Sequence, residues 1–297
     1  MVEIRRILCP IDFSDCSRRA LQHAVAIAKW YESHITALHV IRPVFIPQPP
    51  VLFAAPAKAA TSADRDALEQ ELRGWLEPAK QAGVKADLVF DEGVPASRIV
   101  DHVSKLQADL IVMGTHGTSG LERFMLGSVA ERVLRTAGCP VMTVPPPVTG
   151  AGRIPYTKIL CPVDFSDSSL TALQYAFSLA KESDARVTIL HVFEWPAEAE
   201  MPIQGFDVPE YRRLIEGDAR ARLDALVTDD VRVWSKPETR VAHGKPYRRI
   251  LEAAEADGAD LIVMGVHGRN PLDMALFGST TNHVVRRAPC PVLTLKQ

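Results

Sequence analysis

A single pattern of glycines and apolar residues occurs twice in this chain, once in each half. The copies read Gly114-x-x-Gly117-x9-Gly127-Ser128 and Gly265-x-x-Gly268-x9-Gly278-Ser279, and each follows the seven letters ADLIVMG. Flanking landmarks recur in the same order, because ILCPIDFSDCS returns as ILCPVDFSDSS and CPVMTV returns as CPVLTL. A repeat of this length is a whole domain rather than a solenoid unit of about 20 to 50 residues. Half of 297 residues can bury a core of its own, so we predict two similar domains.

The segment 145–153 marks the join between them. It reads PPPVTGAGR, which has no apolar periodicity and is rich in residues that end strands and helices. We therefore predict domains over residues 1–146 and 155–297.

The amino-acid composition identifies no binding partner, but it argues against some classes of partner. The share of hydrophobic residues, 47%, and the net charge of −2 are ordinary for a soluble globular protein and give no basic field for nucleic acid. No apolar run approaches the length of a membrane helix, and the amino-terminal apolar stretch is too short for a secretory signal. We expect a cytoplasmic protein that binds neither nucleic acid nor membrane.

The cysteines favour reduced thiols. Five is an odd number, and no spacing matches a zinc site. Four are equivalent across the repeat, and we interpret them as small buried strand residues rather than redox or metal groups: Cys9, Cys139, Cys161 and Cys290.

Short apolar runs alternate with amphipathic segments of helical length. Strands are predicted near 4–11, 35–41, 85–90, 109–113 and 140–144. Helices are predicted over 15–32, 62–82, 95–106 and 127–137, and again over 167–183, 208–227, 245–257 and 278–288. Runs such as LIVM and VMTV are typical of strands buried on both faces. The fold class is therefore α/β, with a five-stranded, doubly wound parallel sheet flanked by helices in each half.

Capping residues support the first helix of each half. Ser14 or Asp15 can accept hydrogen bonds from the free amides of the first helix, and Ser166 or Asp167 can do so in the second copy. After each second strand runs a long proline-containing segment, 43–60 or 194–209, which we expect to border a site or to form a lid.

The repeated polar and glycine residues fall where parallel sheets bind ligands, beyond the carboxyl ends of the strands. Gly114 and Gly117 are expected to let the backbone approach a ligand and to adopt positive φ. Gly127 and Ser128 then open a helix, whose unpaired amides and positive dipole end suit a phosphate. The pattern predicts a phosphate loop in each half. In the second copy Pro271 sits inside the loop.

The two equivalent aspartates each have two possible roles, and two valines can act through their main chain. Asp12 and Asp164 either cap a helix, or bind ligand hydroxyls or a magnesium ion. Val40 and Val192 can pair an adenine edge through their main-chain groups.

The histidines favour structural roles. His116 and His267 lie inside the loops, have no paired nucleophile or carboxylate, and are interpreted as loop-shaping residues. His39 and His191, near strand ends, are interpreted as core histidines with satisfied hydrogen bonds.

With these residues assembled, the chain resembles the universal stress protein family in its tandem, two-domain form. The resemblance covers essentially the whole chain. It rests on the two glycine motifs, on PIDFSD and PVDFSD, on LHV in both halves, on MGTHG and MGVHG, and on CPVMTV and CPVLTL.

The resemblance implies a strand order of 3-2-1-4-5 in each half, pairing of the halves through their fifth strands, and ATP bound with Mg²⁺. The contacts that it implies in the first domain are Asp12, Val40, Gly114, Gly117, Gly127, Ser128 and Val129. In the second domain they are Asp164, Val192, Gly265, Gly268, Gly278, Ser279 and Thr280. Thr280 replaces Val129 and is one of the few departures.

The sequence leaves three hypotheses about the function of the protein. The first is an ATP-binding stress-response or signalling protein, a nucleotide-dependent sensor with an unknown protein partner and no dedicated enzyme activity, although slow ATP hydrolysis stays open. No arginine finger, catalytic base or Walker-type lysine is identifiable. The second is an adenylate-forming enzyme, whose SGGxDS or HxGH signatures are missing here. The third is an interaction scaffold with empty loops.

We also expect the two halves to pair within one chain as a pseudo-dimer. Whether two whole chains pair with each other is left open.

Overall fold

The computed structural model describes residues 2–42, 62–117, 126–146, 154–194, 208–235, 237–266 and 278–296. The predicted lid segment 43–60 and most of 194–209 lie outside the described residues, as do His267, Gly268 and Pro271.

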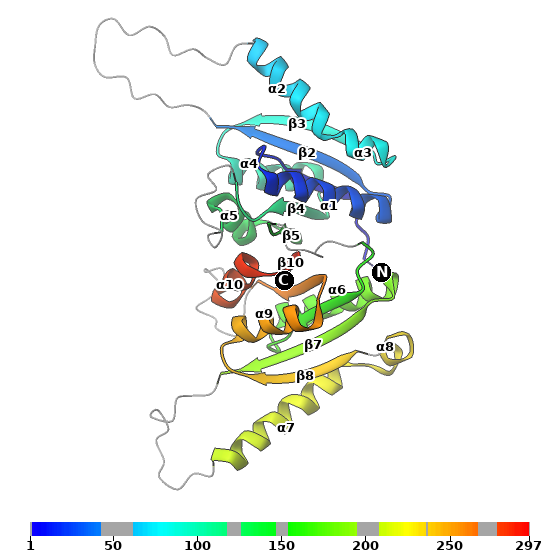
Figure 1. Ribbon diagram of the computed structural model, residues 1–297, viewed down its shortest axis with the longest axis vertical. Helices are drawn as coiled ribbons and strands as arrows, with labels where there is room; N and C mark the ends of the chain where they lie inside the picture. Colours follow the sequence, from blue (N-terminus) through cyan, green and yellow to red (C-terminus); the bar gives the residue numbers. More distant parts are fainter. Residues whose placement is uncertain are drawn as a thin grey trace, which may run out of the picture.

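Strands and helices alternate through both halves (Figure 1). The first half contains β1 (Arg6–Pro10), α1 (Asp15–Tyr31), β2 (His34–Ile41), α2 (Ser62–Trp75), α3 (Glu77–Gln81), β3 (Ala86–Glu92), α4 (Pro95–Leu106), β4 (Leu110–Gly114), α5 (Ser128–Thr136) and β5 (Val141–Val144). The second contains β6 (Lys158–Pro162), α6 (Asp167–Ser183), β7 (Arg186–Phe193), α7 (Val208–Leu226), α8 (Asp229–Trp234), β8 (Glu238–His243), α9 (Pro246–Asp257), β9 (Leu261–Gly265), α10 (Ser279–Arg287) and β10 (Val292–Leu295).

The strands form one ten-stranded sheet in the order β3-β2-β1-β4-β5-β10-β9-β6-β7-β8. Each half therefore has the order 3-2-1-4-5 with parallel neighbours, as the resemblance implied. The halves meet in an antiparallel pair that aligns Val292 with Thr143 and Thr294 with Val141. Both threonines are buried, and their hydroxyls donate to the carbonyls of Val292 and Val141 at 3.3 and 3.0 Å. The α/β fold class is confirmed.

Helices cover both faces of the sheet, so the strands are buried on both sides. In β1, Ile7 packs in the core under α1 and α6, whereas its neighbour Leu8 packs in the core under α4, α5, α9 and α10. This alternation follows from the two-residue period of a strand. It explains why the strands read as unbroken apolar runs.

One helix prediction was wrong in detail, and one helix was missed. The predicted helix 62–82 is broken at Leu76, because Pro78 has no N–H to continue the ladder of hydrogen bonds. The short helix α8 was not predicted, and its acidic first turn, Asp229 and Asp230, suits the positive end of a helix dipole.

The caps resolve a choice that the sequence left open. Ser14 and Ser166, rather than the aspartates that follow them, take the N-cap positions. The Ser14 Oγ accepts from the amide of Ser17 at 3.1 Å, and the second copy repeats this bond from Ser169 at 3.3 Å.

All five cysteines are free thiols. Cys9 and Cys161 are buried strand residues as predicted, and burial raises the pKa of Cys9 to about 12. Cys139 and Cys290 instead lie in the turns before β5 and β10, so the strand assignment was wrong for these two.

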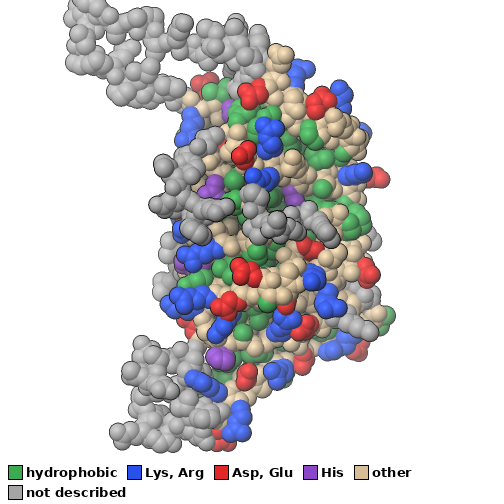
Figure 2. Space-filling view, in the orientation of Figure 1, with side chains coloured by type: hydrophobic (Ala, Val, Ile, Leu, Met, Phe, Trp, Pro, Cys, Tyr) green, Lys and Arg blue, Asp and Glu red, His purple; other side chains and the backbone are tan. Residues whose placement is uncertain are grey.

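The outer surface mixes charges of both signs. On the face shown in Figure 2, basic and acidic side chains are interspersed rather than gathered into one field. Across the described residues, no helix combines the length and apolarity needed to span a bilayer.

Side chains also join the halves beyond the sheet. The Nε2 of His23 in α1 lies 2.9 Å from the hydroxyl of Tyr156, which precedes β6, and both residues are buried. The hydroxyl of Tyr31 donates to Glu182 of α6 at 2.5 Å. Burial lowers the pKa of His23 from 6.5 to about 4.

We predict that this histidine makes the stability of the protein pH-dependent. Between pH 6.5 and about 4 the unfolded chain binds a proton that the folded chain excludes, so acidification favours unfolding. The free energy of unfolding should fall by about 2 kcal/mol more between pH 7 and pH 5 in the parent protein than in His23→Gln, which keeps a polar partner for Tyr156. Denaturant titrations at both pH values measure this difference. The exposed His243→Gln should behave as the parent, and an unchanged pH slope in His23→Gln would contradict the assignment.

The glycine that ends β4 serves helix packing. A Cβ built on Gly114 would lie 2.8 Å from the Cβ and 2.9 Å from the carbonyl carbon of Cys16, in the first turn of α1. Gly265 has the same relation to Ser168, whose carbonyl carbon would lie at 2.9 Å. The expected positive φ was wrong, because neither Gly114 nor Gly117 is among the residues with positive φ. The glycine is needed because helix and strand approach so closely.

We predict that Gly114→Ala destabilises the fold by about 1 to 3 kcal/mol, as overpacking does elsewhere. Gly138→Ala is the matched control, since nothing lies within 4 Å of a Cβ at that position. Chemical denaturation of both variants checks this. Equal stability of the two variants would show that α1 moves freely away from β4.

Candidate functional site

A cavity of about 460 Å³ lies at the carboxyl ends of β1, β2 and β4. It brings together all seven first-domain residues that the sequence analysis selected: Asp12, Val40, Gly114, Gly117, Gly127, Ser128 and Val129. Its position beyond the strand ends follows from the topology, since ligands of doubly wound sheets bind there.

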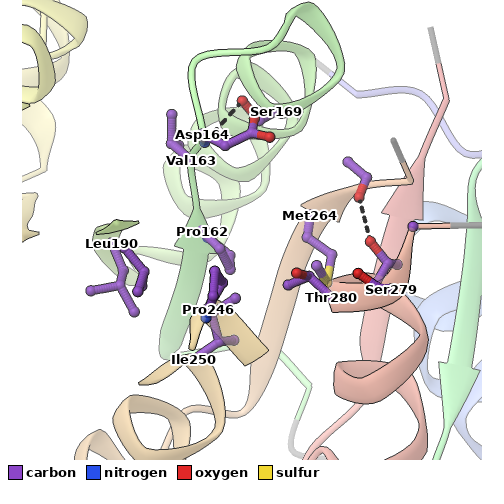
Figure 3. Close-up of a pocket in the computed structure, with 14 residues that line it drawn as sticks. Pro162, Val163, Asp164, Ser169, Leu190, Pro246, Ile250, Met264, Ser279 and Thr280 are labelled. Carbon is purple, nitrogen blue, oxygen red and sulfur yellow. Dashed lines mark hydrogen bonds between the residues drawn. The ribbon is translucent and has the colours of Figure 1, made fainter. Parts of the chain in front are cut away.

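The second domain has a cavity at the equivalent place, of about 160 Å³. Six of the seven selected residues line it: Asp164, Val192, Gly265, Gly278, Ser279 and Thr280. Gly268 lies outside the described residues. Figure 3 shows Asp164 at the end of β6 on one side of the cavity, and Ser279 and Thr280 at the start of α10 on the other.

Asp12 shapes the turn between β1 and α1. Its Oδ1 accepts from the amide of Ser14 at 3.1 Å and from the hydroxyl of Ser14 at 2.6 Å. A Cβ on Gly117 would lie 2.5 Å from the other oxygen, Oδ2, so the carboxylate reaches the glycine loop. One oxygen thus holds the capping serine while the other faces the loop, and the two interpretations of Asp12 are compatible.

The residue between Asp12 and Ser14 has a strained backbone. Phe13 has φ +64°, and Phe165 repeats this in the second copy with φ +65°. A bulky side chain in the left-handed region costs about 1 kcal/mol or more. The Phe13 ring packs edge-on against His39 at 5.0 Å and Trp75 at 5.4 Å, which holds the turn in place. The sequence analysis missed this conformation.

His39 and His191 have satisfied hydrogen bonds, as predicted, but only His191 is a buried core residue, since His39 is half-buried and lines the first cavity. The Nδ1 of His39 lies 2.8 Å from the carbonyl of Ile11, and the Nδ1 of His191 lies 2.7 Å from the carbonyl of Val163. A carbonyl can only accept, so Nδ1 carries the proton in each ring. These bonds tie the end of β2 or β7 to the chain leaving the first strand of its half.

His116 lines the first cavity from the glycine loop. Its Nδ1 lies 2.8 Å from the hydroxyl of Thr115, and its Nε2 is buried with no hydrogen-bond partner in the part of the chain described. Burial, with a smaller effect of Arg286 from the other half, lowers the pKa of His116. The ring is therefore neutral near pH 7 and leaves one buried nitrogen for another group.

The helix that opens at the cavity keeps its first amides available. Gly127 occupies the N-cap of α5 and supplies no side-chain hydrogen bond, and Gly278 does the same for α10. Free amides and the positive end of the dipole attract an anion at this point.

Several lining residues were missed by the sequence analysis. Pro95 and Ile99, four residues apart on α4, give the cavity an apolar wall, and Met113 adds to it. Arg42 lines the cavity directly after β2. Because Arg42 directly follows a predicted strand, the sequence could have identified it as a candidate lining residue.

The two cavities differ in polar details. In the second domain the hydroxyl of Thr281 donates to the carbonyl of Gly265 at 3.1 Å, where the first domain has Ala130. Glu194 stands where the first domain has Arg42. The second cavity, of about 160 Å³, is smaller than the first, and Glu194 is not among the described residues that line it.

A cluster that could hold a metal ion by itself is not present among the described residues, which contain no group of three or more His, Cys, Asp or Glu side chains suited to it. Asp12 is the one carboxylate among the described residues that line the first cavity, and Asp164 has that place in the second.

Comparisons with known proteins agree with this geometry. The sequence model of the Universal stress protein family matches residues 3–145 and 155–296. The chain is 40% identical over 147 residues to Universal stress protein MJ0531 of Methanocaldococcus jannaschii, covering 48% of this chain and 83% of that protein. It is 28% identical over 307 residues to a universal stress protein of Mycolicibacterium smegmatis, covering 98% of this chain and 96% of that protein.

Among solved structures, a universal stress protein from Archaeoglobus fulgidus matches with a TM-score of 0.70 and 23% identity, covering 100% of this chain and 97% of that chain. At that identity the likeness concerns the fold alone. The family model, found once in each half, carries the assignment: this chain belongs to the universal stress protein family, in tandem form.

Proposed function

We propose that the protein binds ATP with Mg²⁺ and acts as a nucleotide-dependent sensor or regulatory module in a stress response. The observation that carries the proposal is the first cavity, in which an uncapped helix N-terminus, a glycine loop and a carboxylate lie around one space. Its volume of about 460 Å³ is within the range of small-ligand sites, about 300 to 1,000 Å³.

The lining residues fit the parts of an adenine nucleotide. Val40, Ile99 and Met113 offer apolar contacts for a purine ring, and the main chain of Val40 ends a strand where an adenine edge can pair. The amides at the start of α5 and the hydroxyl of Ser128 suit the phosphates. The buried, unpartnered Nε2 of His116 supplies one more polar group that a ligand can satisfy.

Asp12 is the residue that would hold Mg²⁺. Proteins bind this ion through one or two carboxylates together with substrate phosphates and water, and the single carboxylate of this cavity fits that pattern. The ion would neutralise phosphate charge next to the carboxylate.

We propose binding rather than rapid turnover. Two described histidines line the first cavity, and neither is hydrogen-bonded to a carboxylate that would orient it as a base: His39 Nδ1 lies against a carbonyl and His116 Nδ1 against the Thr115 hydroxyl. Efficient phosphoryl transfer normally needs a positioned base in addition to any cations on the transferred group. Occupancy would then change the surface offered to a protein partner.

The Gly127→Ala variant tests phosphate binding. A Cβ there would lie 3.3 Å from the carbonyl oxygen of Thr115 and 3.9 Å from the amide nitrogen of Gly117, so the carbonyl must shift slightly and the methyl fills space between helix and loop. We expect MgATP to bind at least about tenfold more weakly, measured by calorimetry, because the phosphate loses close contact with the amides. Gly138→Ala is the control. Parent protein that binds no MgATP and releases no nucleotide on denaturation would support the scaffold alternative instead.

The Asp12→Asn variant separates the two roles of the carboxylate. Asparagine can still accept from Ser14 and keep the turn, so the melting temperature should stay within about 2 °C of the parent. Affinity for MgATP should fall about tenfold while affinity for metal-free ATP does not fall, since the amide is a poor magnesium ligand. The exposed Asp15→Asn serves as control. Unchanged affinity with a lowered melting temperature would assign Asp12 to capping alone.

A further inference from the structure

A second cavity, of about 410 Å³, adjoins the first-domain site, and we call it the annex. Its lining consists of Arg42, Gly93, Val94, Pro95, Ala96, Ser128, Val129 and Arg132. Four of these residues also line the first cavity, namely Arg42, Pro95, Ser128 and Val129. The two spaces therefore meet at the first turn of α5.

Two helices begin at the annex. α4 starts at Pro95 and α5 at Ser128, and neither N-cap residue, Val94 or Gly127, supplies a side-chain hydrogen bond. Pro95 has no N–H, so the first amide that α4 offers is that of Ala96, whereas α5 offers its amides from Ser128 onward. These amides and the positive dipole ends of both helices lie at the annex, which favours a negatively charged occupant.

Two guanidinium groups add formal positive charge. Arg42 and Arg132 are exposed side chains of the annex wall, and none of the described residues that line the annex is acidic. Within the described ranges, neither guanidinium makes a hydrogen bond or ion pair. Several other arginines among the described residues are paired, as Arg240 is with Asp257 at 2.8 Å. Arginine presents a fork of donors that matches phosphate oxygens.

We propose that the annex is a second anion subsite, which takes the distal phosphates of an adenine nucleotide whose first phosphate lies at the start of α5. The inference rests on the proposed function and deepens it. The first-domain site would then distinguish nucleotides by the number of their phosphates.

The second domain lacks this arrangement. Glu194 stands in place of Arg42, and His283 stands in place of Arg132. Tyr247 replaces Ala96, and its ring stacks on His283 with centroids 4.4 Å apart and planes at 24°. Burial lowers the pKa of His283, so its ring is neutral near pH 7. Lys245 stands in place of Val94, so the aligned positions of the second domain carry one cation and one anion where the first domain carries two cations. Selection by phosphate number is thus a property of the first domain.

The test compares AMP, ADP and ATP, each with Mg²⁺, by calorimetry on the full chain. In the parent protein the affinity should rise from AMP to ATP. Arg132→Ala should weaken ATP binding about tenfold, the usual scale of a lost charged hydrogen bond, and weaken AMP binding less than about twofold. Arg42→Ala should act in the same direction, and Arg132→Lys should recover part of the loss, because it keeps the charge without the fork.

The controls separate the possible failures. Arg220→Ala removes an exposed arginine from α7 and should leave all three affinities unchanged. If Arg132→Ala and Arg42→Ala leave ATP unaffected, or weaken AMP and ATP by the same factor, the annex is not a subsite while nucleotide binding stands. If the parent protein binds none of the three nucleotides, the proposed function fails, and the annex proposal with it.

Discussion

The pairing of β5 with β10 is the constraint on which the rest of the molecule depends. Each half taken alone would end in a strand whose outer backbone groups have no partners, and such an edge invites pairing with other chains. The antiparallel ladder from Thr143–Val292 to Val141–Thr294 satisfies both edges at once. Because it is a single ladder, it also fixes how the second half is oriented relative to the first. The two cavities take their positions from that orientation, since each lies at the carboxyl ends of its own strands.

Much of this could be predicted from sequence because the signals were redundant. Runs such as LIVM predict doubly buried strands, and in the structure successive residues such as Ile111 and Val112 pack into the two cores on opposite faces. The same logic placed Asp12, Val40 and Gly114 together, since parallel strands end at one edge of their sheet. The role of these residues toward a ligand stays a prediction, although their convergence on one cavity is observed.

What could not be predicted depends on contacts between distant segments. Gly114 was expected to be glycine because the backbone needed positive φ. In the structure it is glycine because Cys16 packs closely against it, and this contact between distant segments cannot be predicted from the local sequence. The left-handed Phe13 is stabilised by rings from β2 and α2, so its conformation is a tertiary effect. The annex was missed for the same reason, because Arg42 and Arg132 are far apart in sequence and meet only after folding.

The covalent join between the halves changes what evolution can do with the sites. In a dimer of identical subunits, every substitution appears in both copies, and a change that helps one interface or cavity must be tolerated in the other. A tethered pair holds its two halves at high effective concentration without requiring them to match. The replacement of Arg42 by Glu194, and of Ala96 by Tyr247, shows this freedom in use. One gene thus carries two cavities that can specialise independently, within a single continuous sheet.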